Sequence, residues 1–140
     1  MRVATELTVG RPVPAIDPVS QPYWEFTLDG VLSIQHCGSC GSTQFYPRPI
    51  CVTCGAVPAL VPASGRGTVH TFSIIRQNGM QPFKQQLPYV VAIVELEEGP
   101  RLMSNIIDCD IDAVDIGSAV EVEFVRLNDE AALPFFRLVS

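Results

Sequence analysis

Four cysteines arranged as two C-x-x-C pairs constrain the fold of this chain more than any other feature. Two residues separate the cysteines of each pair, and ten residues separate the pairs, which are Cys37 with Cys40 and Cys51 with Cys54. This spacing lets both sulfurs of a tight turn reach one ion, and a glycine directly after each pair supplies the permissive backbone that such a turn needs. Two such turns joined by a hairpin predict a tetrahedral four-thiolate metal site.

Zinc is the metal that this site is expected to hold. Four thiolates select zinc or iron, and an iron site of the rubredoxin type usually has a tighter aromatic and proline shell than the sequence CVTCG provides. Because four protein ligands leave no coordination position open, the metal cannot activate water, and its predicted role is structural. His36 is predicted to face solvent rather than to replace a cysteine, and Cys109 to be a free, partly buried thiol.

The length of the chain allows one domain with a small module attached, and its charge disfavours a nucleic acid partner. It has 140 residues, of which 47% are hydrophobic, and a net charge of −6. Residues 1–94 hold six Lys/Arg against four Asp/Glu, a balance of +2, whereas residues 95–140 hold three against eleven, a balance of −8. Since an acidic protein repels phosphates, any anion-binding surface is expected mainly in the first two thirds.

Nothing in the sequence predicts secretion or a membrane span. The first 16 residues lack the apolar run of a signal peptide, and the longest apolar run, LPYVVAIVEL, is about half of a membrane span. We therefore expect a soluble, cytoplasmic protein with no membrane partner. In the cytoplasm, paired cysteines more often bind metal than form disulfides.

The chain is predicted to begin with an extended arm and a short helix. Three prolines without a period mark the arm, and a helix over residues 20–30 follows, capped by Ser20 and ended by Gly30. Three aromatic residues make this helix too apolar to stand free in water, namely Tyr23, Trp24 and Phe26. It is expected to dock either on its own domain, which is the common arrangement for aromatic residues, or on another subunit.

The rest of the chain is predicted to be β-structure. Two short strands, within 31–37 and 43–51, flank the first cysteine pair, and VPALVPASG at 57–65 is interpreted as a connector. Five strands are then predicted at 66–77, 88–97, 101–108, 118–127 and 133–139. Five strands with short turns favour a small barrel of the OB type.

The predicted fold class is therefore mainly β. We expect an N-terminal arm and short helix at 1–30, a rubredoxin-like zinc ribbon at 31–60 and a five-stranded OB-fold barrel at 61–140.

The candidate motifs for catalysis and calcium binding each lack residues that the function requires. DCDIDAVD offers several aspartates, but its loop lacks Gly at the sixth position and Glu at the twelfth, so a solvated acidic turn is expected. With His36 and His70 as the only histidines, no Ser-His-acid set can be assembled. The sequence therefore does not favour an enzyme that acts alone.

Taken together, these motifs resemble the family of acyl-CoA-associated OB-fold proteins with an N-terminal rubredoxin-like zinc ribbon. The resemblance rests on PYWEF, CGSCGSTQFYPRPICVTCG, SGRGTVHTFSI, LPYVVAIVELEEGPRLMSNIIDCD and IGSAVEVEF. It covers residues 22–136, nearly the whole chain. The combination is much more specific than the cysteines or the barrel alone.

The resemblance implies a function that depends on a partner. Members of this family accompany thiolase-superfamily enzymes such as thiolases, lipid-transfer-type aldolases and acyltransferases, and some accompany hydratases. It implies a non-catalytic accessory subunit with structural zinc, in a hetero-oligomer whose thiolase-like or lipid-transfer-type catalytic subunit acts on carbon-carbon bonds of CoA thioesters. The chain would support assembly and acyl-CoA binding. Eight arginines to one lysine are typical of GC-rich genomes, which makes sterol side-chain and aromatic acid degradation candidate pathways.

Coenzyme A carries phosphates, so basic side chains are candidates to bind it. Arg48 and Arg66, near the junction of ribbon and barrel, are the preferred pair. The full candidate set is Arg48, Arg66, Arg76, Lys84 and Arg101. Each of these side chains, taken alone, also fits a solvated surface charge.

Three other functions stay open at this point. An OB barrel can bind single-stranded nucleic acid by stacking bases on aromatic rings, here Phe72, Phe83 and Tyr89, although the net charge of −6 disfavours it. The chain could also be an accessory domain of an acyl-CoA hydratase. The third alternative is an electron carrier of the rubredoxin type, which would need iron rather than zinc.

Overall fold

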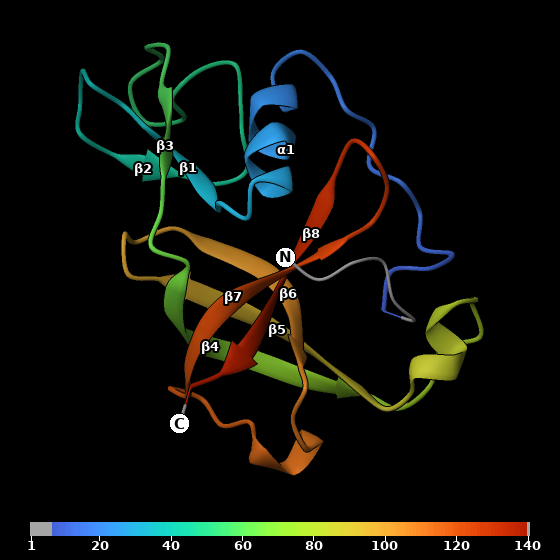
Figure 1. The fold of residues 1–140 in the computed structure, drawn as a ribbon. Helices are drawn as coiled ribbons and strands as arrows, with labels where there is room; N and C mark the ends of the chain where they lie inside the picture. Colours follow the sequence, from blue (N-terminus) through green and yellow to red (C-terminus); the bar gives the residue numbers. More distant parts are fainter. Residues whose placement is uncertain (1–6, 140) are drawn as a thin grey trace.

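A computed structural model describes residues 7–139 of the chain, and Figure 1 shows a small ribbon module and a helix beside one another above a barrel. The predicted fold class, mainly β with an N-terminal helix, a ribbon and a five-stranded barrel, is confirmed. The elements in chain order are α1 (Gln21–Leu28), β1 (Ser33–His36), β2 (Thr43–Gln44), β3 (Ala59–Pro62), β4 (Arg66–Ile75), η1 (Phe83–Gln86), β5 (Tyr89–Leu96), β6 (Arg101–Ile107), η2 (Ile111–Ala113), β7 (Ala119–Arg126) and β8 (Ala132–Leu138).

The barrel closes in the strand order β4-β5-β6-β8-β7, with β7 pairing back onto β4. Its pairs are antiparallel except that of β6 with β8, which run parallel. Along β5, half-buried and buried residues alternate over the whole strand, so that every second side chain fills the interior. A Cβ added at Gly67 would lie 2.3 Å from the backbone oxygen of Glu95, so the close approach of β4 to β5 requires glycine there.

Helix α1 starts differently from the prediction. Ser20 stands directly before it, but its side chain caps no helix N–H. Instead, the Ser20 N–H donates to Asp17 Oδ1 at 2.7 Å, and the Asp17 N–H donates to Ser20 Oγ at 3.2 Å. This reciprocal capping pair lies one turn earlier, where Pro18 suits the first position after a cap. Gly30, at φ +73°, ends the helix as predicted.

The segment interpreted as a connector contains a strand. Residues Ala59–Pro62 form β3, which pairs antiparallel with β1 from Ser33↔Pro62 to His36↔Ala59 and completes a three-stranded sheet in the order β2-β1-β3. Proline at the end of an edge strand is compatible with pairing because its missing N–H faces away from the ladder. The strand therefore spans the expected boundary between ribbon and barrel at residues 60 and 61.

The helices that the structure describes are short. None of those within residues 7–139 combines the length and the hydropathy that a membrane span requires.

Candidate metal centre

The four sulfurs of the two C-x-x-C pairs converge on one point of the ribbon. Cys37 Sγ lies 3.5 Å from Cys54 Sγ, Cys40 Sγ lies 3.7 Å from Cys51 Sγ, and all four sulfurs lie within 4.8 Å of one another. A tetrahedral zinc with Zn–S bonds of about 2.3 Å places its sulfurs roughly 3.8 Å apart. The donor set and its spacing therefore fit a closed structural zinc site, as the sequence predicts.

Each cysteine pair is held by its own backbone turn, and the two turns have the same hydrogen-bond pattern. In the first, the Cys37 N–H donates to Ser42 O at 2.9 Å and the Gly41 N–H donates to Cys37 O at 2.8 Å. In the second, the Cys51 N–H donates to Ala56 O at 2.7 Å and the Gly55 N–H donates to Cys51 O at 2.9 Å. The two glycines have φ of +77° and +81°, which confirms the permissive backbone expected at these positions.

A serine between the pairs adds a hydroxyl to the cluster. Ser42 Oγ lies 2.9 Å from Cys40 Sγ and 3.3 Å from Cys51 Sγ. These contacts lower the pKa of Cys40, and they lower that of Cys51 to about 5, with further help from backbone N–H groups of the second turn. Because the thiolate is the form that binds metal, the contacts with Ser42 favour the metal-binding form of Cys40 and Cys51.

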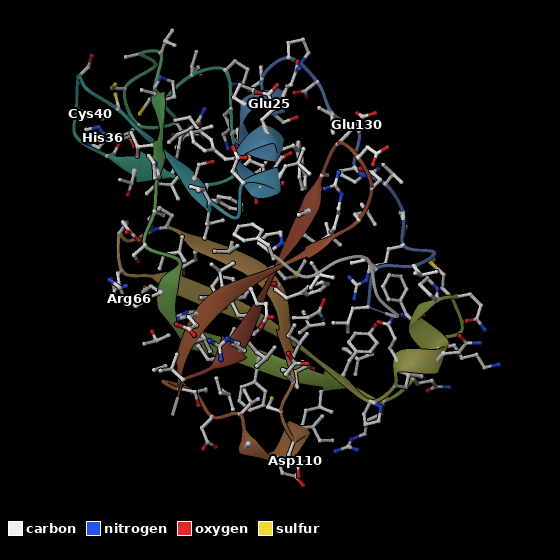
Figure 2. All side chains as sticks on the ribbon, viewed as in Figure 1. Glu25, His36, Cys40, Arg66, Asp110 and Glu130 are labelled. Carbon is white, nitrogen blue, oxygen red and sulfur yellow. The ribbon has the colours of Figure 1, made fainter. Side chains whose placement is uncertain are left out.

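The alternate ligand considered, His36, and the remaining cysteine, Cys109, are not members of the four-sulfur cluster. His36 is exposed near the tip of the ribbon, where Figure 2 labels it beside Cys40, and the metal-ligating group found among residues 7–139 contains only the four cysteines. Cys109 is half-buried in the barrel domain, where burial first and the neighbouring Asp110 next raise the pKa of its thiol. Both residues are placed as the sequence predicts.

Two buried glutamines that sequence reasoning missed hold the loop between the cysteine pairs. Gln35 Oε1 accepts from the Arg48 N–H at 2.9 Å, and its Nε2 donates to Arg48 O at 3.0 Å. Gln44 Oε1 accepts from the Val52 N–H at 3.0 Å, and its Nε2 donates to Ile50 O at 3.2 Å. Glutamine in a short strand ordinarily indicates a surface position, so nothing in the local sequence marks either residue.

An aromatic cluster joins α1 to the ribbon. Tyr23 makes edge-to-face contacts with Trp24, Phe45 and Tyr46, at centroid distances of 5.0, 5.6 and 5.3 Å. Trp24 Nε1 donates to Tyr46 Oη at 3.0 Å. Of the two docking partners considered for the helix, its own chain therefore takes Tyr23 and Trp24, and these residues are buried without a second subunit.

The five predicted CoA contacts do not converge on one surface. Arg66 and Arg101 stand at the starts of β4 and β6, at the end of the barrel nearest the ribbon, and each pairs with a glutamate: Glu97 at 3.1 Å and Glu95 at 3.0 Å. Arg48 lies on the ribbon loop. Arg76 and Lys84 follow β4 toward the opposite end of the barrel, near η1, and Arg48, Arg76 and Lys84 are all exposed. Figure 2 labels Arg66 below the ribbon.

Two family models match the chain and together span most of it. The model of the ChsH2 rubredoxin-like zinc ribbon domain matches residues 24–57, and the model of the ChsH2 C-terminal OB-fold domain matches residues 60–125. The first range contains most of α1, strands β1 and β2 and both cysteine pairs, and the second contains most of the barrel.

Proteins similar in sequence come from archaea and bacteria. A DUF35 domain-containing scaffold protein of Methanothermobacter thermautotrophicus is 44% identical over 96 residues, which are 67% of this chain and 71% of that protein. A probable enoyl-CoA hydratase alpha subunit of Thermomonospora curvata is 34% identical over 128 residues, 91% of this chain but 40% of that protein. Among solved structures, a chain of the Ltp2-ChsH2(DUF35) aldolase superposes with a TM-score of 0.80 at 33% identity, covering 90% of this chain and 98% of that one.

Proposed function

Because this chain belongs to the family of zinc ribbon and OB-fold proteins that includes ChsH2 and the DUF35 scaffold proteins, we propose that it is a non-catalytic accessory subunit of a thiolase-superfamily enzyme. The catalytic partner is a lipid-transfer-type aldolase or a thiolase, and the complex acts on carbon-carbon bonds of CoA thioesters in the cytoplasm. The chain supports assembly of the complex and binding of its CoA substrate.

One observation carries this proposal. The chain of the Ltp2-ChsH2(DUF35) aldolase matches 90% of this chain at 33% identity, with ribbon and barrel both included. The matched arrangement is thus a chain that is one part of an aldolase complex. The name scaffold protein, which the archaeal relative carries, supports the same kind of role.

The zinc site supports a structural rather than a catalytic contribution. Its four cysteines supply all the ligands of a tetrahedral ion, so substrate has no position to occupy on the metal. Zinc bound in this way stabilises the ribbon, whose own buried residues are few, by about 10 kcal/mol or more.

We further propose that basic side chains bind the phosphates of CoA, with Arg48 and Arg66 as the preferred pair. Arg66 now pairs with Glu97 on the surface, with both side chains well exposed. An exposed pair of this kind is worth about 1 kcal/mol or less, so a phosphate can displace the glutamate at small cost. The same reasoning applies to Arg101 and Glu95.

Co-expression with the neighbouring open reading frames, followed by purification under native conditions, tests the proposal. We expect a thiolase-like protein to co-purify and the complex to cleave or form carbon-carbon bonds on acyl-CoA substrates. Substitution of Arg48 and Arg66 by alanine should then raise KM for the CoA thioester more than it lowers kcat. A chain that stays monomeric and partnerless would contradict the proposal.

A second candidate is an accessory domain of an acyl-CoA hydratase. The 34% identity to the Thermomonospora curvata protein, whose name is that of a probable enoyl-CoA hydratase alpha subunit, favours it. The same purification separates the two candidates, because here the co-purifying protein would be a hydratase and the complex would hydrate an enoyl-CoA.

Salt-sensitive binding of single-stranded oligonucleotides is not expected from a chain with a net charge of −6.

A further inference from the structure

Arg11, in the arm that precedes α1, carries a guanidinium enclosed by aromatic rings. Its Cζ lies 5.0 Å from the ring centroid of Phe83 in η1 and 5.0 Å from that of Phe135 in β8. The Arg11 Nε donates to Leu7 O at 2.6 Å, which folds the arm around the side chain. In Figure 1 this arm runs from beside η1 up to the start of α1.

No carboxylate neutralises this guanidinium within residues 7–139. Its outer nitrogen reaches only neutral oxygens, at 3.4 Å from the Gln86 amide and 3.4 Å from the Asn105 amide. Burial lowers the pKa of Arg11, yet an arginine stays protonated in proteins. Four other arginines each pair with a carboxylate: Arg66 with Glu97, Arg101 with Glu95, Arg126 with Asp129 and Arg137 with Glu121.

Arg11 lines a groove between α1, the ribbon and strands β6 and β8. The groove has a volume of about 260 Å³, and Arg11 is the one charged residue among the described residues that line it. Aromatic and aliphatic side chains make up most of the walls, including Trp24, Phe45 and Met103, and the Met103 side chain is 71% exposed. Asn105 places its amide oxygen beside the cation, and Ser104 also lines the groove, where its hydroxyl donates to Pro134 O.

These walls favour a carboxylate carried on an apolar segment of protein. A partly desolvated guanidinium binds a carboxylate strongly because both are planar and form paired hydrogen bonds. The volume is below the roughly 300–1,000 Å³ of small-molecule pockets and suits a few side chains. Because the chain as a whole carries −6, a positively charged groove restricts where an acidic segment can dock.

We propose that this groove is the docking site for an acidic and apolar segment of the catalytic subunit, whose carboxylate pairs with Arg11. The inference rests on the proposed function, because it needs that subunit as its partner. It assigns to Arg11 the role of an anchor that fixes how the two chains fit together.

The affinity of the reconstituted complex tests whether the positive charge of Arg11 contributes to binding. Arg11→Gln should raise the Kd for the co-purified catalytic subunit by about thirtyfold, since it leaves a partly buried carboxylate unpaired, and Arg11→Lys should recover part of that loss. Arg126→Gln, a surface arginine outside the groove, is the matched control and should change Kd by less than about threefold. Melting temperatures of all variants show whether the arm stays packed.

A photo-reactive amino acid placed at position 103 tests the surface without touching Arg11. We expect it to cross-link, in the native complex, to a peptide of the catalytic subunit in which Asp or Glu stands among apolar residues. The same amino acid at Met80, which is 61% exposed and lies outside the walls of this groove, should give no such adduct. Replacement of the cross-linked carboxylate in the partner should then cost no further affinity in the Arg11→Gln background.

The outcomes separate this inference from the proposed function. If the catalytic subunit co-purifies but Arg11→Gln binds it normally, or if position 103 cross-links only to a second copy of this chain, the docking site is wrong and the proposed function stands. If no catalytic subunit is recovered with the wild-type chain, both fall. Should Arg11→Gln prove less stable than the wild type, the cross-link from position 103 decides.

Discussion

The side-chain amide of Gln44 donates to the side-chain oxygen of Gln35 at 2.7 Å inside the ribbon. Gln35 comes from β1 and Gln44 from β2, where they are directly paired in register. Each amide also bonds the backbone of the loop that leads to the second cysteine pair. The two glutamines therefore tie the zinc ligands Cys51 and Cys54 to the strands that carry the first pair.

Gln44→Leu should weaken the ribbon and its hold on zinc. Leucine keeps the approximate volume but removes the hydrogen bonds to the Val52 N–H and the Ile50 carbonyl, each worth about 0.5–1.5 kcal/mol. We expect a lower melting temperature and faster transfer of zinc to a chromophoric chelator. Gln85→Leu, at an exposed position, should behave like the wild type, and equal rates for both variants would contradict the role of Gln44.

Cys37→Ser or Cys51→Ser should release the metal and unfold the ribbon. Loss of one thiolate removes most of a binding free energy of about 10 kcal/mol or more, which the ribbon has no large core to replace. Metal analysis should find about one zinc per chain in the wild type and little in either variant, and protease should cut within residues 31–62. The Cys109→Ser variant should keep its zinc. A Cys37→Ser variant that retains its metal and leaves the partner's activity undiminished would contradict the structural role of the zinc site.

Tyr23→Phe should make the chain more resistant to alkali. Burial first, and the nearby Tyr46 next, raise the pKa of Tyr23 above its value in the unfolded chain. Its contribution to stability is therefore fully present below about pH 10 and is lost as the pH rises from there toward the raised pKa. We expect urea unfolding at a series of pH values to show that the free energy of unfolding declines less steeply for the variant above about pH 10, which is roughly the pKa of tyrosine in an unfolded chain. Parallel curves for the two proteins would contradict this.

Gly67→Ala should destabilise the barrel. The added methyl group would meet the Glu95 carbonyl oxygen at 2.3 Å, and because that oxygen belongs to the backbone of β5, β4 and β5 must move apart. Overpacking of this kind costs about 1–3 kcal/mol, which denaturant unfolding measures. Gly38→Ala is the matched control, because no atom lies within 4 Å of its added Cβ, and equal losses in both variants would argue against the contact.

Local patterns in the sequence predicted the elements that are specified by residues close together in the chain. The C-x-x-C spacing and the following glycines specified both metal-binding turns, because all the bonds of such a turn lie within six residues. The five barrel strands were expected at nearly their observed limits, because alternation and turn residues are local signals. The five strands and their short turns also predicted the small barrel, and the family resemblance implied the same fold.

Features that depend on residues distant in sequence were decided by the tertiary structure. Strand β3 forms in a proline-containing segment because β1 offers it an unpaired edge, and Gln35 and Gln44 become buried only once β1 and β2 pair. Arg66 and Arg101 acquire glutamate partners across neighbouring strands, whereas Arg11 meets Phe83 and Phe135, which lie 72 and 124 residues further along the chain. The sequence by itself determined the two metal-binding turns and the five barrel strands. Which charges are neutralised and which stay open to a partner follows from long-range packing, because a counter-charge must be brought close in space.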